Sequence, residues 1–288
     1  MSLMERIAAM IGAAGARLVE AARWSRAEIV TRELAIGDLG KEFDGYTIVA
    51  LSDFHHPPTL DARWIGRLVD TANAIGPDLV ALLGDYGTSF KHLPAMSRAW
   101  YRTALAAMAP ECARLDARDG VVAVLGNHDY YAGADEVRAW LRGFGAEVLV
   151  NRARVIRRGH ARLRVAGMDD IAEGTVNPWV GCEAGPMHPT LVLSHNPDSV
   201  LHLARDVRAD AMLAGHTHGG QVVLPWYGAP LRMASVCGRQ SASGWVAQDR
   251  TALYVMRGVG AQLPIPVRVN CPPEILVLRL RSGDQQPA

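Results

Sequence analysis

The 288-residue sequence has few cysteines, almost no net charge and no long apolar run. Its four cysteines, Cys112, Cys182, Cys237 and Cys271, are scattered and form no C-x-x-C pair. This spacing argues against a zinc knuckle or a thioredoxin-like motif and favours reduced thiols in a cytosolic protein. Thirty basic residues nearly balance 29 acidic ones. Proteins that bind a nucleic-acid duplex usually have a basic excess, so we expect no such partner.

The apolar run IAAMIGAAGA at residues 7–16 is too short to span a bilayer, and no clear signal-peptide cleavage site follows it. Its apolar residues recur on one helical face, which predicts an amphipathic helix within residues 1–28. We expect this helix to dock on its own domain; the alternative is that it lies on a membrane surface. The protein is therefore expected to be cytoplasmic or, under the alternative, peripheral to a membrane.

Five short apolar runs predict buried strands, at residues 46–52, 78–84, 120–126, 190–195 and 210–216. Val, Ile and Leu dominate these runs with little alternation, as is typical of strands covered on both faces of a sheet. Helical periodicity predicts helices at 61–75, 94–110 and 134–143. The alternation of strands and helices indicates an α/β fold with parallel strands.

The second half of the chain has a different pattern. Residues 153–158 and 161–168 predict a hairpin, and short strands with many Gly and Pro follow in 221–281. We therefore expect mixed sheets whose antiparallel part is C-terminal. The long loops 169–188 and 225–248 are candidate binding loops.

Each of the five predicted strands ends in side chains that can bind a metal ion: Asp53 and His55, Asp85, Asn127, His195, and His216 with His218. Ligands of open α/β sheets bind beyond the carboxyl ends of the strands, so these side chains are expected to converge. His216 and His218 are two residues apart, and in an extended segment both would point to the same side.

These seven N and O donors are too many for one tetrahedral ion, but they suit two ions that share a bridging carboxylate. Mixed imidazole and carboxylate ligands fit Mn, Fe, Zn, Co or Ni. Two such ions about 3.5–4 Å apart hold the attacking and leaving oxygens of a phosphoryl displacement in line. Each motif alone has an ordinary explanation as a turn, a helix cap or a buried histidine. All five motifs in this order favour a metal site.

With these motifs the sequence resembles the calcineurin-like metallophosphoesterase superfamily over about residues 29–281. The matching blocks are D-x-H (53–55), G-D (84–85), G-N-H-D (126–129), His195 and G-H-T-H (215–218). LSHNPD (193–198), AGHTHGGQ (214–221) and RGVG (257–260) are similar to its bacterial branch of YkuE- and YaeI-type phosphodiesterases. The resemblance implies a four-layer α/β/β/α sandwich of two mixed β-sheets, within a catalytic domain at 29–288.

The resemblance also implies roles for the residues. Asp53, His55 and His218 would hold the first divalent ion, Asn127, His195 and His216 the second, and Asp85 would bridge both. His128 would be catalytic, either stabilising the phosphoryl oxygens or protonating the leaving group. Asp129 would orient His128 or a neighbouring loop, or would only cap backbone. Manganese is the favoured metal.

The predicted reaction is hydrolysis of a phosphodiester or pyrophosphate bond by attack of a metal-bridging hydroxide. The segment GDYGTSF (84–90) lacks the Arg of the protein phosphatases and, at Thr88, the Tyr ligand of the purple acid phosphatases. A small molecule is therefore favoured over a phosphoprotein.

Two alternatives stay open. One is a UDP-2,3-diacylglucosamine-type pyrophosphatase of lipid A synthesis, whose lipid-linked substrate would need an apolar channel near Trp179 or Trp226. The other is a non-catalytic metal-binding scaffold. The sequence does not predict an oligomeric state.

Overall fold

The computed structural model describes residues 27–57, 60–180, 187–231, 233–248, 250–264 and 266–283. The amphipathic helix predicted at 1–28 lies outside these residues, apart from its last two positions. Within the described ranges, no helix has both the length and the apolar character needed to cross a membrane.

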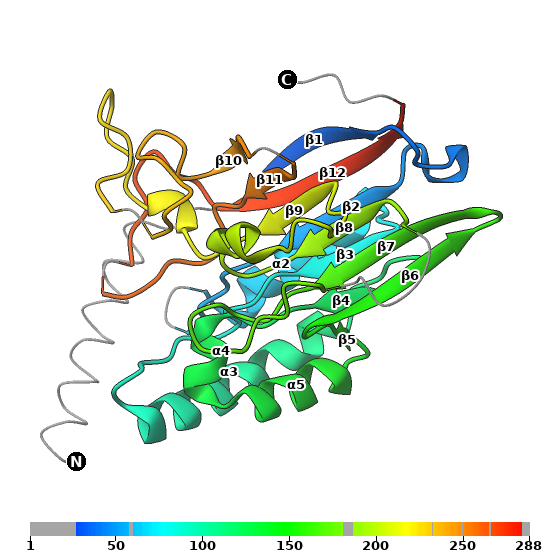
Figure 1. Cartoon of the computed structure of the whole chain (residues 1–288). Helices are drawn as coiled ribbons and strands as arrows, with labels where there is room; N and C mark the ends of the chain where they lie inside the picture. The colour runs from blue at the N-terminus through cyan, green and yellow to red at the C-terminus, as the bar shows by residue number, and fades with distance from the viewer. Residues whose placement is uncertain are drawn as a thin grey trace, which may run out of the picture.

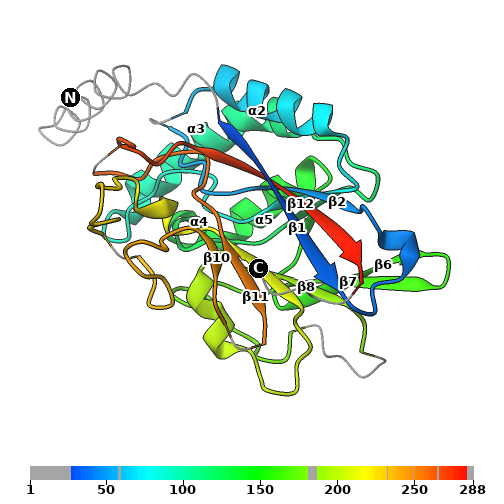
Figure 2. The same cartoon turned by 90° about the horizontal axis from the view of Figure 1, so that it is seen from above.

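Sheet 1 has six strands, and its order begins at the outer edge with β1 (Figure 1). The order is β1 (Glu28–Ile36), β12 (Glu274–Ser282), β2 (Thr47–Leu51), β3 (Leu79–Leu82), β4 (Val121–Ala123) and β5 (Glu147–Val148). Strands β2 to β5 are parallel, and β12 is antiparallel to β2. Seen from above, β1 and β12 run side by side in the same direction (Figure 2), in agreement with their parallel pairing.

Sheet 2 also has six strands, in the order β10 (Gly244–Val246), β11 (Ala252–Val255), β9 (Ala211–Ala214), β8 (Thr190–Leu193), β7 (Ala161–Gly167) and β6 (Arg152–Arg158). Its four central strands are parallel, and the pairs at both edges are antiparallel. Both sheets are mixed, and the predicted hairpin is β6–β7. The expected antiparallel pairing in the second half of the chain is confirmed by this hairpin, by β10 with β11, and by β12, which pairs with β2.

Helices cover the outer face of sheet 1 (Figure 1). They are α2 (Ala62–Ile75), α3 (Pro94–Cys112), the short α4 (Asn127–Ala132) and α5 (Ala134–Gly143). Helix α2 begins after Asp61, whose carboxylate accepts a hydrogen bond of 2.7 Å from the Trp64 backbone N–H, and ends at Gly76 in the left-handed conformation. The predicted helices are confirmed to within two residues at each end.

The two sheets stack face to face through an apolar layer that includes Ile48, Val122 and Leu213, all fully buried. The outer face of sheet 2 packs against loops and the 3₁₀ helix η2 (Pro197–His202), and its described apolar cluster contains no α-helical residue. Two further 3₁₀ turns are η1 (Lys41–Phe43) and η3 (His218–Gly220). The predicted α/β fold of two mixed sheets with flanking helices is confirmed, with a fourth layer of 3₁₀ turns and loops.

Candidate metal centre

All seven predicted ligands lie where parallel strands end, at the same end of the two sheets. Sheet 1 contributes Asp53 and His55 after β2, Asp85 after β3, and Asn127 after β4; sheet 2 contributes His195 after β8, and His216 and His218 after β9. Six of the seven are buried and His216 is half-buried. The convergence expected from the sequence is therefore present.

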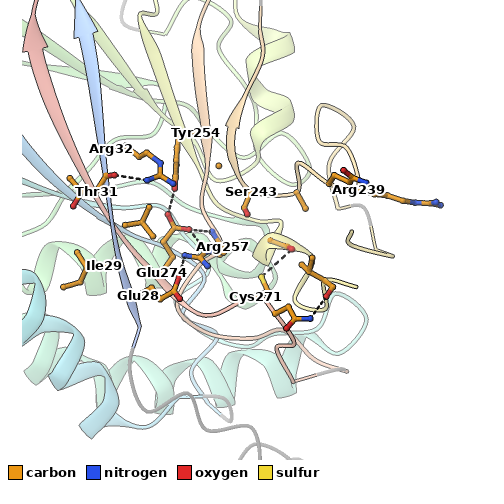
Figure 3. A pocket seen from close by; sticks show the side chains of 17 residues that line it. Glu28, Ile29, Thr31, Arg32, Arg239, Ser243, Tyr254, Arg257, Cys271 and Glu274 are labelled. Atoms are coloured by element: carbon orange, nitrogen blue, oxygen red, sulfur yellow. Dashed lines mark hydrogen bonds and ion pairs between the residues drawn. The ribbon is translucent and has the colours of Figure 1, made fainter. Parts of the chain in front are cut away.

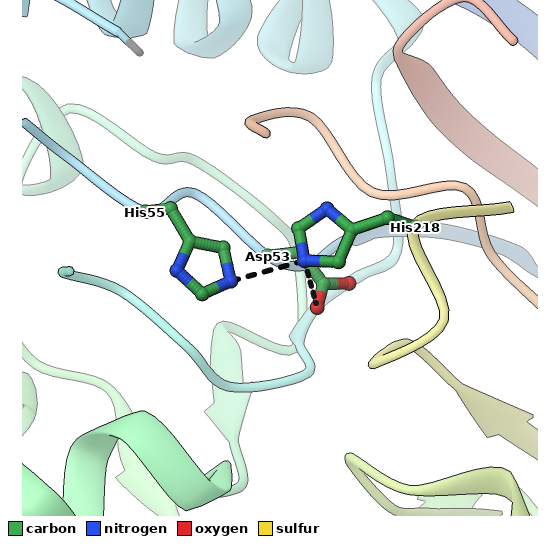
Figure 4. A group of neighbouring side chains, drawn as sticks. All are labelled: Asp53, His55 and His218. Carbon is green, nitrogen blue, oxygen red and sulfur yellow. Dashed lines mark hydrogen bonds and ion pairs between the residues drawn. The ribbon is translucent and has the colours of Figure 1, made fainter. Parts of the chain in front are cut away.

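Asp53, His55 and His218 form the first group of neighbouring donors (Figure 4). His218 Nε2 lies 3.0 Å from His55 Nε2 and 3.5 Å from Asp53 Oδ1. One donor atom from each residue lies within 4.8 Å of the other two, as ligands of one ion must.

Asp85 connects this group to a second one. Its Oδ2 lies 3.4 Å from His55 Nε2 and 3.2 Å from His195 Nε2. His195 Nε2 is in turn 3.2 Å from His216 Nδ1. Asn127 Oδ1 is buried and has no hydrogen-bond partner among the described residues. Asp85 therefore has the position expected of a bridging carboxylate, and the Asn127 oxygen is available to a cation.

The protonation states of the site suit metal binding. Burial lowers the pKa of His55 and of His218 well below the usual value, with a contribution from the Arg268 guanidinium at His218. Burial and the charge of His195 lower the pKa of His216 to about 4. These three imidazoles are neutral near pH 7, so each has a lone pair for a metal.

Asp85 and His195 behave differently because they form a pair. Burial opposes the charged form of both, but their mutual attraction outweighs it, lowering the pKa of Asp85 and raising that of His195. The Nδ1 of His195 faces the Leu83 carbonyl at 2.8 Å, so Nδ1–H donates there and Nε2 faces the site. Two carboxylates, one amide and four imidazoles without a thiolate fit divalent Mn, Fe, Zn, Co or Ni.

The backbone at the site is strained. Five of the seven predicted ligands have positive φ: Asp53 (56°), His55 (45°), Asp85 (56°), His216 (70°) and His218 (52°). A residue with a side chain held in this region costs on the order of 1–3 kcal/mol, and such residues cluster at functional sites. The rest of the fold therefore holds these donors in a conformation that the chain alone would avoid.

Two glycines allow the loops to approach closely. A Cβ on Gly126 would lie 2.3 Å from Asp85 Oδ1, and one on Gly258 (φ +70°) would lie 2.6 Å from Asp53 Cβ. The loop after β11 is also bonded to the loop after β2, because Val259 N–H donates to the Ser52 carbonyl at 2.9 Å. The RGVG segment thus ties sheet 2 to sheet 1 beside Asp53.

His128 lies beside these donors and is 7% exposed. Its backbone N–H donates to Asp85 Oδ1 at 2.9 Å, and its ring Nδ1 faces the Ser89 carbonyl at 2.9 Å. Because a carbonyl only accepts, Nδ1 carries a proton. His128 Nε2 is 3.0 Å from Gln262 Nε2, an amide N–H donor, so Gln262 holds the ring on its other side.

Asp129 contacts backbone rather than the His128 ring. Its carboxylate accepts hydrogen bonds from the backbone N–H groups of Gly126 (2.7 Å), Asp85 (3.0 Å) and Tyr86 (3.2 Å), and from the Tyr101 hydroxyl. Burial and the charge of Asp85 raise its pKa to about 7. These contacts fit both the role of orienting a neighbouring loop and the alternative that Asp129 only caps backbone.

Asp170 is a buried carboxylate at the same sheet edge that the sequence analysis missed. It follows β7, which is parallel to β8. Its Oδ1 accepts from the backbone N–H groups of Ala172 and Glu173, at 3.0 and 2.9 Å, whereas Oδ2 has no hydrogen-bond partner among the described residues. Burial raises the pKa of Asp170, and the charge of His195 lowers it. Asp170 comes three residues after the end of β7, just as Asp53 and Asp85 follow β2 and β3, so the same sequence pattern could have indicated it.

Arg268 is a second residue that no motif indicated. It is 5% exposed, and its guanidinium donates to the carbonyls of His218 (3.1 Å), Arg257 (2.6 Å) and Cys271 (3.3 Å). It also donates to the Gly260 carbonyl at 2.8 Å. Arg268 therefore joins the loop of His218 to the RGVG segment.

Two pockets flank His128 and His218 and meet at Gln262 and Leu263. One, of about 230 Å³, is walled by Leu231, Met233, Leu263 and Pro264 and reaches His218. The other, of about 380 Å³, contains Ser89, Lys91, Asn127, His128 and Tyr131.

A further pocket of about 540 Å³ borders the loop that carries His216 and His218, with Gly219 and Cys271 in its wall (Figure 3). Three of its charged side chains are bonded to one another: Arg257 pairs with Glu28 and Glu274 at 2.9 Å each, and Tyr254 donates to Glu274 at 2.7 Å. None of the seven candidate ligands lines this pocket.

Comparison with known proteins agrees with this geometry. A sequence model of the family "Calcineurin-like phosphoesterase" matches residues 46–220. Phosphodiesterase YaeI of Escherichia coli is 33% identical over 243 residues, covering 82% of each chain. The uncharacterized metallophosphoesterase YkuE of Bacillus subtilis is 29% identical over 248 residues, covering 83% of this chain and 80% of that protein.

A shorter similarity joins the chain to the UDP-2,3-diacylglucosamine pyrophosphatase LpxG of Chlamydia muridarum. The identity is 35% over 100 residues, which cover 33% of this chain and 30% of that protein. The family match spans more than half of the chain and contains all seven candidate ligands. The chain therefore belongs to the calcineurin-like phosphoesterase family of metal-dependent phosphoester hydrolases.

Proposed function

We propose that this protein hydrolyses a small phosphodiester or pyrophosphate with two divalent metal ions. The observation that carries the proposal is the contact of Asp85 with His55 on one side and His195 on the other. Two sets of donors that share one carboxylate suit a pair of ions better than a single ion. Manganese is the metal we favour within the set that these donors fit.

Asp53, His55 and His218 would hold one ion, Asn127, His195 and His216 the other, and Asp85 both. When bound, the pair supplies an activated water and neutralises charge on the phosphoryl group. The low pKa of Asp85 keeps it ionised. The catalytic domain would comprise residues 29–288.

His128 would act on the substrate through its Nε2 atom. The Ser89 carbonyl holds the proton of Nδ1, so any second proton on the ring is at Nε2, which faces the pocket. When Nε2 takes up a proton it gives up the hydrogen bond from the Gln262 amide, and the Nε2–H can then donate to a phosphoryl oxygen or to the leaving group. Asp129 would be a positioning residue, because it holds the Gly84–Asp85 loop and does not reach the pocket side of His128.

The two pockets that meet at Gln262 favour a substrate with groups on both sides of phosphorus. A phosphodiester or pyrophosphate has two such substituents, whereas a monoester has one. One pocket is apolar and the other contains Lys91 and Ser89, so the two substituents would differ in polarity.

Metal removal tests the proposal. Chelated protein should lose hydrolysis of bis-p-nitrophenyl phosphate, and Mn²⁺ should restore it. The chelated protein should also melt about 5 °C lower, because tight ligand binding to the native state stabilises by a few kcal/mol. Elemental analysis of the purified protein supplies the metal content. Full hydrolysis by metal-free protein would exclude the proposal.

The second candidate is a lipid-linked pyrophosphate substrate. Two observations favour it: the similarity to LpxG over 100 residues, and the apolar pocket beside His218. A panel of nucleotide, sugar-nucleotide and acylated sugar-nucleotide substrates tests it. A preference of kcat/KM for the acylated compounds would support this candidate, and equal values with and without acyl chains would contradict it.

A further inference from the structure

A single loop beside the candidate metal centre exposes five large apolar side chains. They are Leu224, Trp226, Tyr227, Leu231 and Met233, which we call the apolar tip. Trp226 is 96% exposed, the highest value among the large apolar side chains of the described residues. The loop lies among the yellow loops at the left of Figure 1. Apolar side chains grouped in this way mark interaction or membrane sites, whereas single exposed ones are common.

The fold holds the loop in place. Leu224 and Gly228 exchange two backbone hydrogen bonds of 2.9 Å, and the Ala229 N–H donates to the Arg239 carbonyl at 2.7 Å. Trp226 has φ of +62°, an outlier for a bulky side chain. A strained backbone that points an indole into solvent indicates a function for the exposed ring.

The charged residues of the segment that carries the apolar tip are all basic, and one carboxylate from outside it, Asp198, accepts from the Ser235 and Val236 backbone N–H groups. Residues 221–247 contain no Asp or Glu and two arginines, Arg232 and Arg239. The Arg239 guanidinium lies 4.7 Å from the centre of the Tyr227 ring. Tryptophan, tyrosine and arginine together suit the interface of a bilayer, where the rings enter the headgroup region and the Arg239 guanidinium meets anionic lipids.

The apolar tip is continuous with the candidate site. Leu231 and Met233 also line the pocket of about 230 Å³ that reaches His218 and Gln262. Leu231 and Met233, with Leu263 and Pro264, thus give an apolar chain from the tip a wall to lie against within the pocket that reaches His218.

We propose that the apolar tip docks on the surface of an anionic lipid bilayer. The docked protein would act on a phosphodiester or pyrophosphate whose apolar part stays in that bilayer, and this second step rests on the proposed function. The docking itself does not, because it needs no reaction.

Sedimentation of the full-length protein with lipid vesicles tests docking. We would compare vesicles of phosphatidylcholine with vesicles in which phosphatidylglycerol replaces part of it. The double variant Trp226→Ser, Tyr227→Ser should bind anionic vesicles about tenfold more weakly, since burial of one large apolar side chain is worth that much or more. Trp179→Ser is the matched control, because Trp179 is also exposed (55%) but lies on another loop, and it should bind as the parent does.

Neither Trp226 nor Tyr227 lines the two pockets that meet at Gln262. The double variant should therefore hydrolyse soluble bis-p-nitrophenyl phosphate at the parental rate. Equal vesicle binding by the parent and the double variant would overturn the proposal. So would a change from dimer to monomer in the double variant with no vesicle binding by the parent, because the apolar tip would then be an interface between two copies. Asp85→Asn protein should bind vesicles normally, which separates failure of docking from failure of the proposed reaction.

Discussion

The two sheets contribute different chemistry to the candidate metal centre. Sheet 1 supplies every oxygen donor of the predicted set, from Asp53, Asp85 and Asn127, together with one imidazole, His55. Sheet 2 supplies imidazoles alone, from His195, His216 and His218. Each proposed ion would take ligands from both sheets, so the complete site exists only when the sheets are stacked.

The same difference appears in how the sheets are covered. Sheet 1 carries α-helices on its outer face, and sheet 2 carries loops and 3₁₀ turns. The apolar tip belongs to this looser side. The helix-covered sheet thus supplies both carboxylates of the predicted set, and the loop-covered sheet supplies three of its four imidazoles and the apolar pocket wall of Leu231 and Met233.

The largest effect is expected from Asp85, whose carboxylate lies 3.4 Å from His55 of sheet 1 and 3.2 Å from His195 of sheet 2. Asp85→Asn should lower hydrolysis of bis-p-nitrophenyl phosphate on the order of a thousandfold or more, because paired ions contribute several kcal/mol to the transition state. Metal content by elemental analysis should fall at both positions. Asp70→Asn, on the exposed face of α2, is the matched control. A metal-loaded, active Asp85→Asn protein would show that the sheets bind metal independently of each other.

The next largest effects are expected from one histidine of each sheet. His55→Ala in sheet 1 and His195→Ala in sheet 2 should each remove one of the two ions, since the two rings contact Asp85 from opposite groups. The metal-to-protein ratio should halve in both variants. Loss of the same ion from both, detected by spectroscopy of Co²⁺-substituted protein, would contradict the division into two groups.

His128→Ala should lower kcat about a hundredfold or more while both ions stay bound, because the ring acts on protons and is not a proposed ligand. Steady-state kinetics and elemental analysis measure the two effects. His160→Ala, in the exposed turn between β6 and β7, serves as control. If His128→Ala loses metal, the role assigned to this side chain is wrong.

The smallest effect is expected from Asp170, the buried carboxylate after β7 that is not one of the seven predicted ligands. Asp170→Asn should weaken metal affinity about tenfold, as is usual for groups that act through a ligand. Competition with a fluorescent chelator measures the affinity. Asp169→Asn is the matched control: Asp169 accepts from the Tyr130 hydroxyl and from the Thr175 N–H, so its loss should lower the melting temperature and leave metal affinity unchanged. An identical affinity in Asp170→Asn would mean that this carboxylate only closes its own turn.

The sequence predicted the elements that carry the site because its signals there are local. Each apolar run is followed directly by a donor, so the donors could be located at the strand ends without knowing the order of the strands in each sheet. The helix at 134–143 matches the observed bounds of α5. The positions of Asp53, Asp85 and His195 follow from the same rule.

The residues that the sequence missed depend on contacts between distant segments. β7 was assigned to a local hairpin, but it also pairs in parallel with β8, where Arg164 lies opposite Thr190. That second pairing places Asp170 at the site. Gln262 contacts the His128 ring, and Arg268 donates to backbone carbonyls. Neither contact leaves a spacing or a periodicity in the sequence from which it could be predicted.

The left-handed backbone at Asp53, His55, Asp85, His216 and His218 has a consequence for protein engineering. Glycine adopts this conformation without steric penalty, so replacing any of these residues with glycine relieves local strain while removing a metal donor. A screen for heat resistance of the metal-free protein that ignores turnover would tend to select such replacements. Thermostable variants of this protein should therefore be chosen under simultaneous selection for catalysis.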